Sequence, residues 1–355
     1  MLKTLLLLAL LLPGNPGDHP GDPANIEVQK LADGVYAVVR TDPPGIMFEA
    51  NSAFVVGDDD VVVIDGGSNP TSAKVVLAAI RKVTDKPVRV LIKTHWHDDH
   101  MMGSTAYPGA EIVAHATAAE DMATQGVVNR KQMVEQGPGF ADFLRKLVAD
   151  GKGFDGHPIT EEERASHVSS VALAERYFAE PGKLQPLPPT LLIQDRLTLV
   201  RGGRTIEVLW LGRAHTRGDI VVHLPKEGIV FTGDIVAGPI PLIGSTSFPL
   251  DYGPTLEKLL ALKASVYLPS HGSVMKDDSY VRLMVRLLAS IRQQTEAAVA
   301  RGETLEQARK SVDLAEFRKA LAGDSKLLNV LFSMYVADPA VMRAYQQATE
   351  SPHVS

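Results

Sequence analysis

The fold of this chain is decided by seven consecutive residues, Thr94-His95-Trp96-His97-Asp98-Asp99-His100. They follow an apolar run, residues 88–92, that is typical of a buried strand. Because alternate residues of an extended chain project to the same side, His95 and His97 can bind one cation. Asp99 and His100 come where the chain turns into a helix and can reach a second cation. The pattern predicts a metal site with nitrogen and oxygen ligands, and its alternative is an exposed His-rich loop without metal.

The composition restricts the chemistry that the chain can perform. Of 355 residues, 45% are hydrophobic and 22% are charged, which is ordinary for a folded globular protein. The chain has no cysteine, which excludes thiol nucleophiles, cysteine-bound zinc, iron–sulfur clusters and disulfides. The net charge of -6 argues against nucleic acid as a partner, because phosphate backbones are bound by cationic surfaces. We therefore expect a small-molecule substrate, and any metal must use His and carboxylate ligands.

The N-terminus has the pattern of an export signal. Lys3 precedes an apolar run at residues 5–12 that is too short to span a bilayer, and residues 13–23 are rich in Pro, Gly, Asn and Asp. No A-x-A cleavage site follows the run. We expect residues 1–24 to be a signal peptide and linker, the protein to be periplasmic or secreted, and no stable membrane span to remain. The alternative is a frayed apolar N-terminus.

Residues 25–276 alternate between short apolar strands and helical stretches. The first clear strand is residues 61–64, a helix is predicted from about residue 70 to 82, and the next strand is residues 88–92. Strands return at residue 190 and end near residue 269, with one helix among them at about residues 254–263. This β-α-β alternation predicts a catalytic domain of the α/β class.

Two helical regions accompany this domain. Residues 117–181 are charged and Ala-rich without a strand-like run, and we read them as a helical insertion. Residues 277–355 show only helical periodicity, broken at Gly302 and Gly323, which predicts three or four amphipathic helices in a C-terminal helical region.

Three further loops follow predicted strands and each presents one candidate ligand. These ligands are His215, Asp234 and His271. A single His or Asp after a strand is more often a cap or a satisfied polar group. Together, and in this order after the His-rich string, they become specific.

The ordered motifs resemble those of the metallo-β-lactamase fold family. The five motifs are matched, over about residues 27–276, by Asp65, the His95–His100 string, His215, Asp234 and His271. The resemblance implies an α/β fold built as a four-layer αβ/βα sandwich, here with a helical insertion and C-terminal helices. An Asp at position 234 is typical of the glyoxalase II-like branches, whereas true lactamases of the third subclass usually lack it.

The resemblance also implies which residues bind metal. It assigns His95, His97 and His215 to the first metal, Asp99, His100 and His271 to the second, and Asp234 as the bridge between them. Asp65 is expected to be a structural carboxylate and not a ligand. Two zinc ions per chain are the expected cofactors, although iron or manganese also suit a set of nitrogen and oxygen ligands.

The implied activity is that of a zinc-dependent hydrolase. A hydroxide shared by two metals attacks the carbonyl of an ester, lactone, thioester or amide, with Asp99 orienting the hydroxide as the catalytic carboxylate. Hydrolysis of β-lactams is a specific alternative. Two alternatives come from other classes: a non-haem iron redox enzyme of the same fold, and a binding protein that uses the fold as a scaffold.

Several expectations concern the neighbours of the ligands. Asp98 is expected to be solvated or to cap a helix, and therefore to be dispensable, while Thr94 steadies the ligand loop by local hydrogen bonds. Tyr252 is expected to pack beneath the loop that carries Asp234. The insertion is expected to cover the metal cleft and, with residues 239–249, to set substrate choice. Its helically spaced apolar residues either line a pocket or pack the insertion on the body: Phe140, Phe143, Leu144 and Leu147.

Overall fold

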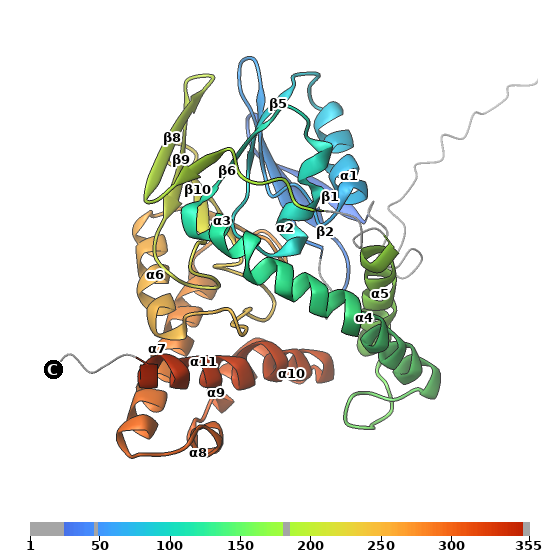
Figure 1. Cartoon of the computed structure of the whole chain (residues 1–355), viewed down its shortest axis with the longest axis vertical. Coiled ribbons are helices and arrows are strands. Elements are labelled where there is room, and N and C mark those ends of the chain that lie inside the picture. Colours follow the sequence, from blue (N-terminus) through green and yellow to red (C-terminus); the bar gives the residue numbers. More distant parts are fainter. Residues whose placement is uncertain (1–24, 46–48, 180–184, 351–355) are drawn as a thin grey trace, which may run out of the picture.

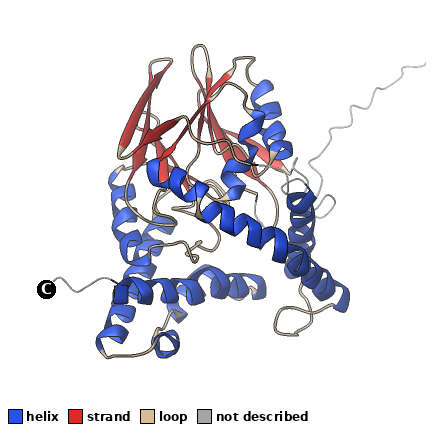
Figure 2. Ribbon diagram, in the orientation of Figure 1, coloured by secondary structure: helices blue, strands red, loops and turns tan. Residues whose placement is uncertain are grey.

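The structure is a computed structural model that describes residues 25–45, 49–179 and 185–350 (Figure 1). The expected signal peptide and linker at residues 1–24 lie outside these residues, so export and location remain predictions. Two β-sheets lie face to face, and helices cover the outer face of each (Figure 2). No described helix is long and apolar enough to cross a membrane.

The first sheet contains seven strands in sequence order. They are β1 (Ile26–Ala32), β2 (Val35–Arg40), β3 (Ser52–Val56), β4 (Val61–Ile64), β5 (Val88–Ile92), β6 (Glu111–His115) and β7 (Leu191–Ile193). The strands from β1 to β4 pair antiparallel, and those from β4 to β7 pair parallel. The strands predicted at residues 61–64 and 88–92 are confirmed as the adjacent parallel pair β4 and β5. Both end at the same edge of the sheet, where the ligand string begins.

The second sheet contains five strands. They are β8 (Arg196–Arg201), β9 (Arg204–Trp210), β10 (Ile220–Leu224), β11 (Ile229–Gly233) and β12 (Val266–Pro269). Only β11 and β12 pair parallel among these strands. Because parallel neighbours end at one edge, the loops after β11 and β12 lie together.

Apolar cores between and outside the sheets produce the four layers of the predicted αβ/βα sandwich. Between the sheets, Ile92 packs with Val222 and Phe231. Outside the first sheet, α1 (Pro70–Arg81) packs through its buried face, and outside the second sheet α6 (Pro249–Ala261) does the same. Helix α1 begins where expected because the Asn69 side chain accepts a hydrogen bond from Ser72 N and Pro occupies the first turn.

The described residues between β6 and β7 form three helices joined by loops. They are α3 (Ala116–Ala123), α4 (Gln125–Asp150) and α5 (Glu161–Ala179), and α4 (green) runs from beside the sheets to α5 in Figure 1. Helix α4 ends at Gly151, whose φ of 65° terminates the helix in a left-handed conformation. Within α4, Leu144 is buried, whereas the neighbouring Phe143 is 42% exposed.

The region after β12 forms five α-helices among its described residues, not the three or four predicted. They are α7 (Ser279–Ala300), α8 (Leu305–Ser311), α9 (Ala315–Ala322), α10 (Lys326–Phe332) and α11 (Asp338–Glu350). The predicted breaks at Gly302 and Gly323 are present. A further break before α9 is stabilised by Asp313, whose carboxylate accepts a hydrogen bond from Ala315 N. Because α8 and α9 are short and only three residues lie between them, helical periodicity in the sequence did not show that they are separate helices.

Candidate metal centre

The candidate ligands lie at the ends of strands from both sheets. His95 and His97 follow β5, and Asp99 and His100 are in the short helix α2 (Asp98–Met101) that comes next. The other candidate ligands lie in the loops after β9, β11 and β12: His215, Asp234 and His271. The structure brings all seven predicted residues into two adjacent clusters.

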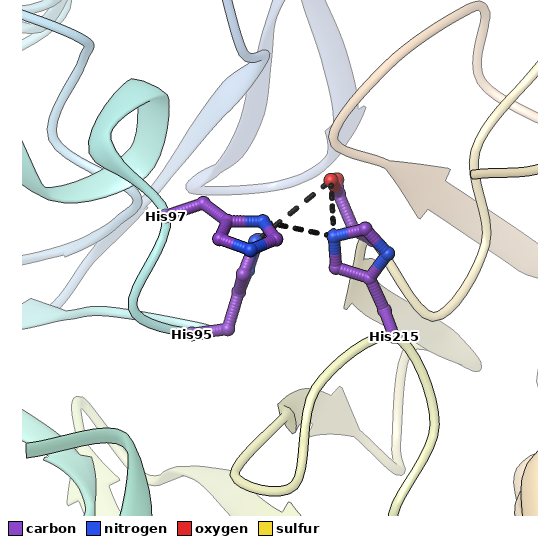
Figure 3. Close-up of side chains that lie close together, drawn as sticks. His95, His97 and His215 are labelled. Carbon is purple, nitrogen blue, oxygen red and sulfur yellow. Dashed lines mark hydrogen bonds and ion pairs between the residues drawn. The ribbon is translucent and has the colours of Figure 1, made fainter. Parts of the chain in front are cut away.

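The first cluster contains His95, His97, His215 and Asp234, whose candidate ligand atoms all lie within 4.8 Å of one another. His215 Nε2 lies 2.9 Å from His97 Nδ1 and 3.4 Å from Asp234 Oδ2. His95 Nε2 lies 3.8 Å from the same carboxylate oxygen. Figure 3 shows the three imidazole rings lying around a common centre.

The second cluster contains Asp99, His100 and His271. Asp99 Oδ2 lies 3.2 Å from His100 Nε2 and 3.2 Å from His271 Nε2. The other oxygen of Asp234, Oδ1, lies 3.6 Å from His100 Nε2 and 3.5 Å from His271 Nε2. Asp234 therefore directs one oxygen to each cluster.

Buried polar atoms without hydrogen bonds test whether cations fit here. Among the described residues, His95 Nε2, His100 Nε2 and Asp234 Oδ1 are buried and make no hydrogen bond. Burying such atoms without partners is costly, and native proteins rarely do so. Several such atoms converge on the same two centres, and all belong to ligand types that zinc, iron and manganese accept. The residues present therefore fit two cations.

The electrostatic environment of the first cluster suits neutral imidazole ligands. Burial, together with the neighbouring His215, lowers the pKa of His97 to about 3. Burial also lowers the pKa of His95 well below its ordinary value. Both rings are neutral at physiological pH and can donate a lone pair to a cation.

The second cluster is dominated by attraction between carboxylates and imidazoles. Burial alone raises the pKa of Asp99 and lowers that of His100, but His100 and His271 outweigh burial at Asp99, and neighbouring carboxylates, chiefly Asp99, outweigh it at His100. As a result the pKa of Asp99 lies well below its ordinary value and that of His100 well above it. The pKa of Asp234 is also lowered, because His271 and His100 outweigh the effect of burial. Both carboxylates are therefore ionised at neutral pH.

Hydrogen bonds behind the clusters orient the rings. Asp65 accepts bonds from Thr94 N and Thr94 Oγ1, both at 2.9 Å, and lies 2.9 Å from His100 Nδ1. These bonds leave Nε2 of His100 facing the cluster, which agrees with the expected structural role of Asp65 and the expected local bonds of Thr94. His215 Nδ1 lies 2.8 Å from the carbonyl oxygen of Leu242, so its Nε2 also faces the site.

Asp98 does not have the solvated role that was expected of it. Arg130 of α4 binds both of its oxygens, with Nε–Oδ2 at 3.2 Å and Nη2–Oδ1 at 2.9 Å. Tyr177 of α5 donates a further hydrogen bond of 2.6 Å to Asp98 Oδ2. The insertion is thus attached directly to the helix that carries Asp99 and His100. We name Asp98, Arg130 and Tyr177 the insertion clamp.

The sequence contains one signal for the clamp that local reasoning missed. The buried residues of α4 are Gly126, Arg130, Gly137, Ala141 and Leu144. Arg130 is a cation on this otherwise uncharged stripe, and buried cations are generally paired. The position of Arg130 on this stripe indicates a buried acidic partner, but it does not identify which Asp or Glu of the chain that partner is.

Tyr252 packs as expected. Its side chain is fully buried, and its hydroxyl donates to the carbonyl oxygens of Asp234 and Ile235, at 2.9 and 3.1 Å. The ring therefore supports the loop that carries Asp234 from below and does not reach a substrate.

A cavity of about 770 Å³ adjoins the second cluster through His271. Residues of β1 and β2, of the loops after β11 and β12, and of α7, α9 and α10 line it. Among the described residues of the insertion, Leu173 is the one that lines it. Phe140, Phe143, Leu144 and Leu147 do not line this cavity, and for Leu144 burial supports the packing alternative.

Comparisons with known proteins agree on the family. The chain matches the metallo-β-lactamase superfamily over residues 46–271. It is 24% identical to a linear primary-alkylsulfatase from Pseudomonas sp., over 72% of this chain and 48% of that protein. It is 25% identical to the acyl-coenzyme A thioesterase MBLAC2 of Bos taurus, over 53% of this chain and 58% of that protein. The chain thus spans about half the length of these two relatives.

Solved structures share the fold. A metallo-β-lactamase from Pontibacter korlensis has 20% identity, covers 74% of this chain and 99% of its own, and superposes with a TM-score of 0.50. The metallo-β-lactamase FIM-1 from Pseudomonas aeruginosa, in its mono-zinc form, has 18% identity, covers 74% and 95%, and also gives 0.50. With the family match, the strand order and the ordered ligand clusters, the chain belongs to the metallo-β-lactamase superfamily.

Proposed function

We propose that this protein is a hydrolase with two zinc ions, and that the seven clustered residues are their ligands. His95, His97 and His215 bind the first ion, Asp99, His100 and His271 bind the second, and Asp234 bridges them. The observation that carries the proposal is that the two oxygens of the Asp234 carboxylate face different clusters. Its Oδ2 lies 3.4 Å from His215 of one cluster, and its Oδ1 lies 3.5 Å from His271 of the other.

The reaction follows from what these groups offer. Two divalent cations, when bound, supply a Lewis acid and lower the pKa of a shared water. Asp99 is the carboxylate of the two clusters with the more exposed side chain, at 22% against 3% for Asp234. Asp99 can therefore accept a hydrogen bond from an attacking water and orient it. Asp65 and the Leu242 carbonyl hold the imidazoles of His100 and His215 in place during turnover.

We further propose an ester-type scissile bond, such as an ester or thioester. The curated relatives are named for hydrolysis of a linear primary alkyl sulfate and of an acyl-coenzyme A thioester, and each name describes an ester-type bond. Lactones and amides belong to the same reaction class. The β-lactamases contribute only a shared fold at 18–20% identity, so β-lactams are one member of the substrate panel.

Metal analysis and a substrate panel test this function. We expect up to two zinc ions per chain, loss of hydrolysis after chelation, and recovery when zinc is restored. The panel comprises esters, thioesters, alkyl sulfates, lactones and β-lactams. Asp234→Asn is expected to reduce turnover and the occupancy of the second ion. Asp142 is an exposed residue of α4, so Asp142→Asn should leave both quantities unchanged. Full activity in a preparation without transition metal would refute the proposal, and tightly bound iron with redox turnover would favour the non-haem iron alternative.

A further inference from the structure

We infer that the cavity beside His271 binds an uncharged aliphatic arm of the substrate, and that the C-terminal helices form its specificity wall. The inference rests on the proposed function and identifies the substrate class of the same site. Two residues connect cavity and metal centre: His271 lines both, and Leu242 lines the cavity while its carbonyl oxygen orients His215. A substrate whose reacting group lies at the two clusters can therefore extend its arm into the cavity.

One wall of the cavity is apolar. It is formed by the loop after β11 and by α5, α7, α9 and α10, and its apolar lining residues are Leu173, Ile240, Leu242, Leu283, Leu321 and Leu331. Tyr280 adds a ring, and its hydroxyl is occupied because it donates to the carbonyl oxygen of Ala237 at 2.7 Å. Binding of a hydrocarbon chain to such a surface is favourable because it removes apolar area from water.

The lining residues from β1, β2 and the loop after β2 include most of the charged groups of the cavity, and these charges are paired or acidic. Arg40 is the one cationic Lys or Arg side chain among the described lining residues, and its Nε lies 2.8 Å from Asp42 Oδ2. Glu49 accepts hydrogen bonds from Ser68 and Ser72, at 2.7 and 2.6 Å. Glu27 adds another carboxylate. A phosphate or carboxylate would meet acidic groups and an already paired cation here, so the occupant is an uncharged chain.

The size of the cavity fits this class of ligand. A volume of about 770 Å³ lies within the usual range of small-molecule pockets. Transfer of one methylene from water to such a surface should raise kcat/KM by up to about fourfold. The gain should accumulate along a chain of increasing length and stop when the cavity is full.

A chain-length series tests the inference on the zinc-loaded full chain. We compare p-nitrophenyl acetate, butyrate, hexanoate and octanoate, which share one leaving group. Ala320 of α9 is exposed and lines the cavity, so the large ring introduced by Ala320→Trp should reduce the space available to the arm. We expect kcat/KM for octanoate to fall at least tenfold, while acetate changes less than twofold. Lys319→Ser, on the same helix but outside the lining, is the matched control.

A binding measurement separates failure of this inference from failure of the proposed function. Decan-1-ol, which contains no hydrolysable bond, should bind the zinc-loaded protein in calorimetry, and Ala320→Trp should weaken that binding at least tenfold. Flat chain-length dependence with zinc-dependent hydrolysis intact would overturn the aliphatic arm but not the hydrolase. Decanol binding without hydrolysis of any ester, thioester or alkyl sulfate would overturn the proposed ester-type reaction. If decanol does not bind, the arm site is refuted whatever the activity.

Discussion

The two helical additions to the sandwich differ in the size of the apolar cluster that attaches each of them. The insertion contacts the metal centre through the insertion clamp, in which one carboxylate binds a guanidinium and a phenol, and through a small cluster in which Ala118 and Met122 of α3 pack with Trp96 and Met101. The C-terminal helices instead share one apolar core with α6 and the second sheet, where Leu287 and Phe332 pack with Tyr252 and Leu256. Figure 1 shows α4 and α5 (green) and α7 to α11 (orange to red), and the two regions meet where Ser325, directly before α10, donates a hydrogen bond of 2.7 Å to Glu162 of α5.

The difference in attachment suggests different roles for the insertion and the C-terminal helices. Val128 of α4 remains 54% exposed, and the cluster that joins α3 to the ligand loop contains four buried residues, so the insertion is held by a small apolar contact together with the insertion clamp. Segments with few buried apolar contacts open at low free energy, whereas a shared core unfolds with the whole domain. We propose that the C-terminal helices, which supply more of the cavity lining than the insertion does, set substrate choice and that the insertion positions the second cluster. The expectation that the insertion covers the metal cleft stays a prediction.

Removal of each region should have the largest and most unequal effects. A chain that ends at Asp277 exposes the faces of Tyr252 and Leu256 that α7 covers, and we expect it not to fold cooperatively. Replacement of residues 125–179 by a flexible Gly/Ser linker should preserve cooperative unfolding and the first cluster, but weaken cation binding at the second. Circular dichroism during urea unfolding and metal titration compare the two. A folded monomer ending at Asp277 would contradict the shared core.

Matched Leu→Ala substitutions sharpen the comparison within the folded protein. Leu287 of α7 and Leu144 of α4 are both fully buried. Leu287→Ala should lower the free energy of global unfolding by about 3 kcal/mol, because it leaves a cavity in the shared core. Leu144→Ala should chiefly speed amide exchange within α4 and α5 and change the global transition less. Equal shifts of the urea midpoint would show that the insertion belongs to the same cooperative unit.

Disruption of the insertion clamp should affect one cluster and not the other. Asp98→Asn should reduce cation affinity at the second cluster by about 10–100-fold, because α2 loses the contacts that position Asp99 and His100. Affinity at the first cluster should stay within about twofold. Stepwise competition with a chromophoric chelator measures both.

A second variant controls for the buried cation that Asp98→Asn leaves behind. Arg130 is 7% exposed, and a buried guanidinium without its partner destabilises by itself. The double variant Asp98→Asn/Arg130→Met removes both charges and should retain the affinity loss while regaining stability. If its second-cluster affinity returned to that of the unsubstituted protein, the clamp would not be a positioning contact.

The smallest effect is expected at Phe143, which lies on the insertion but is 42% exposed. Phe143→Ala should change the free energy of unfolding by less than about 0.5 kcal/mol, as is usual for exposed positions, and leave the chain-length profile unchanged. A selective loss of activity on long-chain esters would return the specificity role to the insertion. Chain-length kinetics and urea unfolding on one preparation decide the matter.

Local patterns in the sequence were enough to predict β4, β5 and the strands between residues 190 and 269, together with the identity of the clustered residues, whereas β1 to β3 and the order of the strands in each sheet came from the structure. His95, His97, Asp99 and His100 lie within six consecutive positions after an apolar strand, so local periodicity was sufficient to bring them together. His215, Asp234 and His271 could be added because each directly follows a strand and because the ordered motifs resemble a known family. These features are encoded by near neighbours in the chain.

Only the tertiary structure decided what surrounds the clusters. The contacts of Asp98 join residues 32 and 79 positions apart, and the cavity joins Glu27 of β1 to Leu331 of α10. Periodicity shows which side of a helix is buried, but not which distant surface buries it. A carboxylate beside a metal motif therefore looks solvated in sequence, and becomes a clamp only when folding excludes water from its far partners.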